Sequence, residues 1–544
     1  MRPSSVRIIT ASSCLLFGAA AWWLGPHSKS DFVAQAQTAK TAQVQPVSAS
    51  IPSTATLKPL SELEVTSAPG TEIYTAKRGE AIPTVARHYL GRTSYLTSSE
   101  LADAIRSVNH RSDSSNILKA DERIVIPGIL SAPITEKTIP VPREFEVRAV
   151  YLTGVMAASD HGLRIIRRWR EVGGNAVVFD IKDSDGSVNI PFEHPLLGEH
   201  KVYIHDVPKF VHFLHQQNMH AIARIAIFRD QRMVTEHPEL AVQSRRNHTA
   251  WRENGKLVWT DPSQPKVQDY NIALAKHVAQ LGVDEIQFDY VRFPAEGDQK
   301  DASFVFQKDQ PDSGDAVQAK NDDPGAESPK PEAEAKPAHR KSKSAAQAQS
   351  AKPHGMQRSD VIAAFLKKAY AEIHPTGALF SLDVFGVMAW QRQVDLSHTG
   401  QDIVQMARYC DVLSPMIYPS HFFGMDNIPR PGDQPAHFIG ESMDRFELIT
   451  KGSGVVIRPW LQAFHWRTRT YSPEYIKIQV ETARSKGGVG FLFWNAANDY
   501  SKPFTAMPEM KAANYKEGSR DNPKYFRGDE LPATTVQAAL SPAK

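Results

Sequence analysis

The sequence predicts an α/β protein: a (β/α)8 TIM barrel preceded by a small βααβ domain. Strand-like and helix-like runs alternate between residues 146 and 508, a pattern typical of a parallel sheet. Eight strand-like runs, each followed by room for a helix, favour a closed barrel over an open sheet. These runs are Arg148–Gly154, Asn175–Lys182, Ala221–Phe228, Asp284–Val291, Ala378–Val384, Asp411–Tyr418, Val455–Gln462 and Gly490–Trp494.

The small domain is expected at residues 72–128. Glu72–Lys77 and Arg123–Pro127 alternate apolar and polar residues as strands do, whereas Ile82–Leu90 and Leu101–Asn109 have helical spacing. The order of these four segments predicts one βααβ unit.

Residues 1–36 predict either a signal peptide or an N-terminal membrane anchor. Arg2 and Arg7 precede an apolar run from Ile8 to Gly25, which is the order of charge and hydrophobicity in a signal peptide. Ala34–Ala36 is a candidate cleavage site, but it lies far from the end of the apolar run, which is itself nearly long enough to span a bilayer. We therefore expect export to the periplasm or cell envelope, and cleavage and retention as an inner-membrane anchor both stay open.

Three segments have compositions typical of disordered chain. Residues 37–70 are rich in Ala, Thr, Ser, Gln and Pro, and residues 296–357 form a polar insertion after the fourth barrel strand. The tail at 516–544 is similar. We expect a linker, a disordered insertion and a loose C-terminus.

Composition excludes some classes of function. The chain has 63 basic and 60 acidic residues, a near balance that gives no electrostatic footprint for nucleic acid. Of the two cysteines, Cys14 lies in the N-terminal apolar run and Cys410 is expected to be an apolar filler. The histidines are scattered and no metal or cofactor is expected; a solvated helical face is the interpretation of the four in one stretch, namely His205, His212, His215 and His220.

The candidate chemistry lies at the carboxyl ends of the predicted strands, where the active sites of such barrels form. The sharpest motif, Gln287–Pro294, places Asp289 inward at the end of the fourth strand among aromatic and β-branched neighbours. That setting disfavours the ionised form, as a general acid requires. The structural alternative is that Asp289 pairs with Arg292 or Arg224 and merely holds a loop.

Asp383 ends the next strand and is the predicted partner of Asp289. Two carboxyl groups flanking a glycosidic bond are the minimal apparatus for its hydrolysis, since one protonates the leaving oxygen and the other attacks or activates water. Asp180 is a third candidate acid. A substrate hydrogen bond or a structural cap is the alternative role for Asp383.

Further polar and aromatic residues near strand ends are predicted to bind substrate, because sugar rings stack on aromatic side chains while their hydroxyl groups need polar partners. For the aromatic members, and for the related Trp466, a place in the core is the alternative. For Asp180, Lys182 and Asp183, which end the second strand, the alternative is a solvated turn. The predicted substrate-binding residues are Lys182, Asp183, Arg224, Arg292, Trp390, Tyr418, Trp460, Gln462 and Trp494.

The small domain resembles the LysM module. The resemblance is carried by "YTAKRGEAIPTVARHYL", "LADAIRSVN" and "LKADERIVIPG", while the middle segment "GRTSYLTSSE" is longer than in that module. It implies binding of peptidoglycan or another glycan that contains N-acetylglucosamine. The alternative is a spacer domain without a ligand.

The barrel region resembles a bacterial "putative glycoside hydrolase" family of TIM-barrel domains. The resemblance is carried by "RAVYLTG", "GGNAVVFDIKDSDGSV", "DEIQFDYVRFP", "SLDVFGVMAW" and "DVLSPMIYPSHF". It implies a polysaccharide substrate, with Asp289 as the leading catalytic residue, Asp180 and Asp383 as supporting acids, and Tyr418 near the reaction centre. The competing hypothesis is a non-catalytic scaffold that binds cell-wall glycan, because a fold alone does not establish an activity.

Overall fold

The computed structural model describes residues 70–112, 116–308 and 355–514. The chain divides into two compact units, with the boundary between Ile134 and Thr135. The predicted N-terminal segment, the linker up to residue 69 and the tail lie outside the described residues. Within the described ranges, none of the helices is both long enough and apolar enough to cross a membrane.

The first unit contains a strand, two helices and a strand, in the order expected from the sequence. Its two strands pair antiparallel, and the Thr97 side chain caps the second helix by accepting a hydrogen bond from Glu100 N. Val85, Leu101 and Ile126 belong to a separate small core. The elements are β1 (Thr71–Thr75), α1 (Ile82–Tyr89), α2 (Ser98–Val108) and β2 (Arg123–Pro127).

The second unit is a closed barrel of eight parallel staves, which confirms the predicted fold class. The strands run around the barrel in the order β11, β9, β5, β4, β3, β15, β14 and β12, and pairing of β12 with β11 closes it. β13 and β14 form one stave that is interrupted at Pro459. The strands are β3 (Val147–Leu152), β4 (Ala176–Lys182), β5 (His220–Ala226), β9 (Glu285–Asp289), β11 (Leu379–Phe385), β12 (Val412–Met416), β13 (Val456–Ile457), β14 (Trp460–Gln462) and β15 (Gly490–Trp494).

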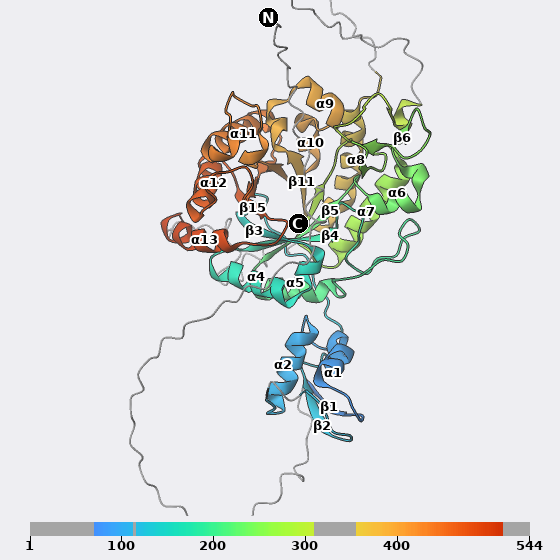
Figure 1. The fold of residues 1–544 in the computed structure, drawn as a ribbon, viewed down its shortest axis with the longest axis vertical. Coiled ribbons are helices and arrows are strands. Elements are labelled where there is room, and N and C mark those ends of the chain that lie inside the picture. Colours follow the sequence, from blue (N-terminus) through green and yellow to red (C-terminus); the bar gives the residue numbers. More distant parts are fainter. Residues whose placement is uncertain (1–69, 113–115, 309–354, 515–544) are drawn as a thin grey trace, which may run out of the picture. The chain divides into compact units, whose positions relative to one another are not determined.

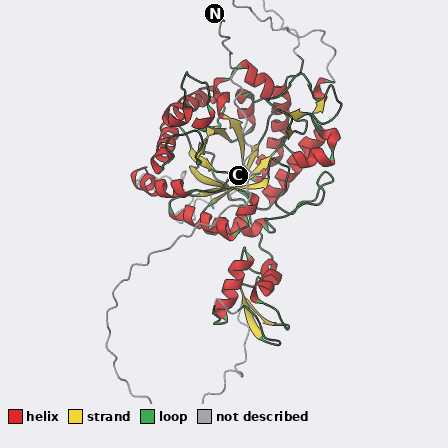
Figure 2. Ribbon diagram, in the orientation of Figure 1, coloured by secondary structure: helices red, strands yellow, loops and turns green. Residues whose placement is uncertain are grey.

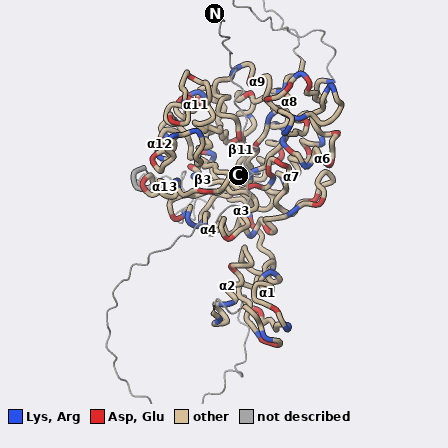
Figure 3. The backbone as a smooth tube through the Cα atoms, viewed as in Figure 1, with Lys and Arg blue, Asp and Glu red and all other residues tan. Residues whose placement is uncertain are grey.

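Helices surround the ring of strands, as Figures 1 and 2 show for this unit. Figure 3 shows acidic and basic residues interspersed along these helices, without segregation of one sign. The helices are α3 (Gly154–Ala157), α4 (Asp160–Glu171), α5 (Val207–Gln216), α6 (Gln231–Glu236), α7 (Pro265–Gln280), α8 (Arg358–Ile373), α9 (Gln393–Thr399), α10 (Ile403–Met406), α11 (Pro435–Thr450), α12 (Pro473–Ser485) and α13 (Ser501–Asn514).

The strands are buried on both faces because side chains fill the barrel interior and helices cover the outside. Every residue of β3, β4, β5 and β9 is buried. Close approach of β15 to β3 depends on Gly490, whose φ is 79° and at which a Cβ atom would lie 1.9 Å from the carbonyl oxygen of Val147. The free Cys410 is buried, in agreement with its prediction as a filler.

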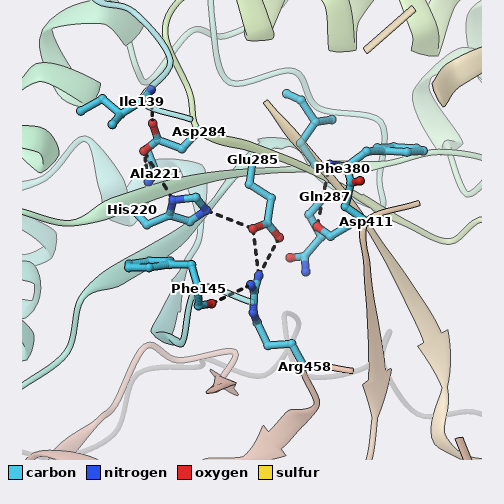
Figure 4. A network of polar contacts seen from close by, with 12 residues as sticks. Ile139, Phe145, His220, Ala221, Asp284, Glu285, Gln287, Phe380, Asp411 and Arg458 are labelled. Atoms are coloured by element: carbon cyan, nitrogen blue, oxygen red, sulfur yellow. Dashed lines mark hydrogen bonds and ion pairs between the residues drawn. The ribbon is translucent and has the colours of Figure 1, made fainter. Parts of the chain in front are cut away.

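A charged network occupies the amino-terminal end of the barrel interior (Figure 4). His220 Nε2 lies 3.0 Å from Glu285 Oε2, and Arg458 Nη1 donates to the same oxygen at 2.8 Å. All three side chains are fully buried. The prediction of a solvated histidine face is therefore wrong for His220, and also for His215, whose side chain is buried against Asp284.

The insertion predicted at residues 296–357 begins later than its composition indicated. Residues 296–308 are ordered, because β10 (Ala302–Ser303) pairs antiparallel with β6 (Gln243–Ser244) from the loop that follows β5. The same loop carries a hairpin, β7 (Arg252–Glu253) and β8 (Leu257–Val258). Residues 309–354 lie outside the described residues.

Candidate active site

The predicted acids meet at the carboxyl ends of adjacent staves. Asp180, Arg224, Asp289 and Asp383 come from β4, β5, β9 and β11, which are consecutive in the barrel. Asp180 pairs in register with Arg224, and Asp289 with Ala226 on the other side of β5. The sequence-predicted candidates therefore share one end of the barrel, the end at which TIM-barrel enzymes place their catalytic groups.

Arg224 holds this group together. Its Nη1 donates to Asp180 Oδ1 at 2.5 Å, and its Nη2 donates to Asp289 Oδ2 at 2.6 Å. Its Nε lies 3.2 Å from Asp289 Oδ2 and 4.0 Å from Asp383 Oδ2. Since Arg224 Nε is this near both oxygens, the two carboxyl oxygens are no more than about 7 Å apart, so the acids are close enough to act on one glycosidic bond.

Asp383 is the carboxyl group most strongly held in its neutral form. It is 1% exposed, and Trp460 Nε1 donates to its Oδ1 at 2.7 Å. Burial, reinforced by the charge of Asp289, raises the pKa of Asp383 well above its usual range, and Arg224 and Trp460 oppose this only in part. A carboxyl group that keeps its proton near neutral pH can act as a general acid.

Asp180 is also completely buried. Burial raises its pKa to about 7, although the nearby Arg224 guanidinium works in the opposite direction. The Tyr151 hydroxyl donates a hydrogen bond to Asp180 Oδ2. Asp183 lies in the following turn, where its Oδ1 accepts from Ser184 N at 2.5 Å, and its charge contributes to the raised pKa of Asp180.

Asp289 is the acid of this group with the most exposed side chain, at 10%. The next residue, Tyr290, has a left-handed backbone with a φ of 55°, which is costly for a bulky aromatic residue. This turn lets Tyr290 N donate to Asp289 Oδ1 at 2.6 Å. Asp289 is paired with Arg224, and the buried setting predicted for a general acid is found at Asp383.

Aromatic side chains line one side of the acid group. Trp494 lies 6.4 Å from Tyr151 and 6.1 Å from Tyr418, measured between ring centroids, and its indole is half-buried. Phe464 packs edge-on against Trp494 at 5.3 Å. Tyr418 is close enough to Asp383 and Asp289 for their charges to raise its pKa further than burial does alone.

Two of the predicted tryptophans lie elsewhere. Trp390 packs against Phe422, with the Arg445 guanidinium carbon 4.9 Å from its ring centroid. Trp466 packs against His421 at 4.8 Å. Trp390 and Trp466 therefore pack against loop and helix residues, and among the described residues neither ring contacts Asp180, Asp289 or Asp383.

Lys182 was predicted to bind substrate, and the structure contradicts this. A bulge between Asp180 and Lys182 shifts the register of β4 against β5, so Lys182 leaves the interior face that carries Asp180. The ammonium group is fully buried, donates to the carbonyl oxygens of Ala226 and Ile227, and lies 2.8 Å from Asp230 Oδ2. It holds the end of β5 in place.

Gln462 is also structural. It is fully buried, its Nε2 donates to the carbonyl oxygen of Phe464 at 3.0 Å, and its Oε1 accepts from Ser420 N at 3.2 Å. Both ends of the amide are used to tie the loops after β12 and β14 together. The predicted contact with substrate is therefore wrong.

Arg292 stabilises the loop after β9. Its guanidinium carbon lies 4.4 Å from the ring centroids of both Trp259 and Phe385, and its Nη1 donates to the carbonyl oxygen of Phe293. Asp289 pairs with Arg224 instead. This environment does not support the predicted contact of Arg292 with substrate.

Tyr151 and Tyr290 are site residues that the sequence patterns did not single out. Tyr151 could have been found as an inward-facing polar residue near the end of the first stave, in the same phase as the acids. The left-handed conformation of Tyr290 had no sequence signal, because aromatic residues rarely adopt it. Among the described residues, no group of three or more His, Cys, Asp or Glu side chains is placed to hold a metal ion.

Comparison with known proteins gives a family match and several matches among solved structures. A hypothetical protein from Ruminiclostridium thermocellum is 29% identical, over 43% of this chain and 97% of its own, with a TM-score of 0.32. The PgaB (BpsB) glycoside hydrolase domain from Bordetella bronchiseptica is 12% identical, over 67% and 99%, with a TM-score of 0.44. The spore cortex-lytic enzyme SleL from Bacillus megaterium is 10% identical, over 80% and 85%, with a TM-score of 0.35. No curated protein matches the chain significantly.

A family model matches the barrel directly. The matched residues, 149–500, begin in β3 and end just after the last stave, so they contain every acid described above. They amount to well over half of the chain. The chain belongs to the family described as "Putative glycosyl hydrolase domain".

Proposed function

We propose that the barrel hydrolyses glycosidic bonds of a cell-envelope or extracellular polysaccharide. The observation that carries this proposal is the convergence of three carboxyl groups on Arg224 at the carboxyl end of the barrel, with Asp383 held neutral. Asp289 is ion-paired in the same group. Glycoside hydrolysis requires two neighbouring acids, one of which carries the proton that the leaving oxygen receives.

In this mechanism Asp383 is the general acid. Its proton passes to the glycosidic oxygen as the bond from that oxygen to the anomeric carbon breaks, and Asp383 becomes a carboxylate. Asp289 supplies the second carboxylate, either attacking the anomeric carbon or accepting a proton from the attacking water. Arg224 and Asp180 act as positioning residues, and the aromatic group of Tyr418 and Trp494 offers apolar faces to sugar rings.

The paired state of Asp289 also fits the second candidate function, a scaffold that binds glycan without cleaving it. Arg224 satisfies Asp180 and Asp289 as the arginine of a purely structural network would. Cleavage by wild-type protein separates the two hypotheses.

The test is release of new reducing ends from peptidoglycan, poly-N-acetylglucosamine and galactosaminoglycan. We expect wild-type protein to cleave at least one of them and Asp289→Asn and Asp383→Asn to lower the rate by about 100-fold or more. Asp444→Asn is the matched control, because Asp444 is exposed and pairs only with Lys486 on the barrel surface. Undiminished cleavage by Asp289→Asn would overturn the assignment, and glycan binding without cleavage by wild type would favour the scaffold.

We further propose that the first unit binds glycans containing N-acetylglucosamine, such as peptidoglycan, and that the protein is exported to the periplasm or envelope. Support for the first point is the LysM-like sequence; support for the second is the charged and apolar order of residues 1–36. Sedimentation with insoluble peptidoglycan, with and without residues 70–134, tests the binding. Fractionation of cells tests the location and whether the N-terminus stays in the membrane.

A further inference from the structure

A polar cavity lies at the same end of the barrel as the acid group. It has a volume of about 460 Å³ and is formed by the loop after β5 and the loop after β9. These loops leave the strands that carry Arg224 and Asp289, so they emerge on the catalytic side. Figure 1 shows β6, which belongs to this region, at the periphery of the barrel unit.

The walls of the cavity carry equal numbers of basic and acidic side chains. Arg246 and Arg252 are its basic residues, and Asp298 and Asp301 are its acidic ones. Arg246 forms ion pairs with both aspartates. A cavity whose carboxylates are already paired offers little to a metal cation, and its balanced charge offers little to an anion.

The remaining polar groups suit hydroxyl and amide groups of a neutral ligand. The Asn247 amide and the Thr249 hydroxyl are exposed, and neither side chain forms a hydrogen bond to any other described residue. Asn254 adds a second amide, which donates to Glu296 at 2.9 Å. Amides and hydroxyls can donate and accept at once, which matches the hydroxyl groups of a sugar.

An aromatic residue and a glycine complete the cavity. Trp251 is buried in its wall. Gly297 has a φ of 75°, and a Cβ atom there would lie 3.2 Å from Cζ2 of Trp251 and 3.0 Å from Asn254 N. The glycine therefore permits a tight packing of the two loops against each other.

The cavity is tied to the segment that bears Asp289. Glu253, between two lining residues, is buried; its Oε2 accepts from Trp259 Nε1 at 2.9 Å and its Oε1 accepts from Ala295 N at 3.0 Å. Trp259 packs against the strained Tyr290 at 5.9 Å. The cavity wall and the acid-bearing turn are thus parts of one packed structure, which fixes their relative position.

We propose that this cavity is a remote subsite that binds one neutral sugar residue of the polysaccharide whose bond is cleaved at the acid group. This proposal rests on the proposed hydrolase function. Binding there holds long chains on the barrel and contributes equally to the ground state and the transition state, so it lowers KM for polymer without changing kcat.

The deciding variant is Thr249→Trp, which fills the cavity from an exposed position. Thr505→Trp, on the exposed surface of α13, is the matched control. Binding of dimers and hexamers of N-acetylglucosamine, N-acetylgalactosamine and glucose is measured by calorimetry on the full chain carrying Asp289→Asn. We expect at least one hexamer to bind and Thr249→Trp to weaken that binding about tenfold, with dimers unaffected and Thr505→Trp without effect.

Failure of this proposal can be told apart from failure of the hydrolase function. Hexamer binding that is insensitive to Thr249→Trp, or absent, overturns the subsite, as does tight binding of inorganic phosphate or Ca²⁺ that Thr249→Trp removes. Failure of the hydrolase function appears as wild-type protein that releases no reducing ends while Thr249→Trp still weakens hexamer binding. With active protein, a KM for polymer raised about tenfold at unchanged kcat supports the subsite, and a loss in kcat alone contradicts it.

Discussion

Asp289 and Asp383 have different environments at the carboxyl end of the barrel. Asp383 is buried beneath Trp460 and receives one hydrogen bond from its indole, whereas Asp289 is paired with Arg224. Burial favours the protonated form of a carboxyl group, and an adjacent cation favours the charged form. Environment, not residue type, therefore distinguishes the two aspartates, and it is the reason that the proposed mechanism uses Asp383 as the general acid.

Replacing Trp460 by Phe tests this assignment. The indole N–H lowers the pKa of Asp383, so its removal raises that pKa further. If Asp383 is the general acid, the alkaline limb of the pH profile of kcat/KM moves to higher pH, and kcat falls. Steady-state hydrolysis across the pH range measures both effects, and Trp466→Phe, away from the acids, leaves the limb in place. An unshifted limb in Trp460→Phe would show that another group limits activity at high pH.

At the scale of one element, the bulge in β4 changes which face of the strand Lys182 occupies. In a regular strand, Asp180 and Lys182 point to the same face. The bulge between them leaves Asp180 in the interior and puts Lys182 against the carbonyl oxygens of Ala226 and Ile227. Asp180 and Lys182 therefore share one strand face by sequence spacing, but they lie in different environments in the folded barrel.

Lys182→Met tests the structural role. Methionine has a similar length but no charge, so Asp230 would lose its buried partner, and we expect the free energy of unfolding to fall by about 3 to 5 kcal/mol. Urea denaturation measures this loss. Lys201→Met is the control, because Lys201 is exposed. A variant as stable as wild type but with weakened substrate binding would instead restore the sequence-based assignment.

At the scale of the whole molecule, the barrel has charged groups at both ends of its interior. The amino-terminal network of His220, Glu285 and Arg458 joins β5, β9 and the stave formed by β13 and β14 across the barrel (Figure 4). Burial by itself would raise the pKa of Glu285, but Arg458 and His220 outweigh it and lower the pKa to about 2. The network therefore stabilises the closed barrel only while Glu285 is charged.

Glu285→Gln tests that contribution through pH. Because the pKa of Glu285 is lower in the folded state, its stabilisation is fully present above about pH 4.5 and is lost as the pH falls towards about 2. We expect the variant to be less stable than wild type at pH 7 by about 3 kcal/mol or more, and the difference to shrink in acid. Denaturant unfolding at several pH values measures it, with Glu372→Gln, an exposed partner of Lys276, as the control. A difference that does not change with pH would contradict the predicted linkage.

The local pattern of apolar and polar residues was sufficient to predict the barrel fold. Alternation and apolar runs located all eight staves, because parallel strands buried on both faces leave a hydrophobic signal in the sequence itself. The ordered start of the insertion was missed, since β10 is only two residues long and depends on pairing with β6, distant in the chain.

The sequence by itself determined the barrel and the identity of the acids near its strand ends. Tertiary structure alone decided which of them meet: Arg224 reaches Asp180 and Asp289 from the neighbouring staves, and Asp383 lies beside Trp460, 77 residues later. It also decided that Lys182 and Gln462 are structural. Periodicity records which face of a strand a residue occupies, but charge pairing and protonation depend on neighbours that only the closed barrel brings together.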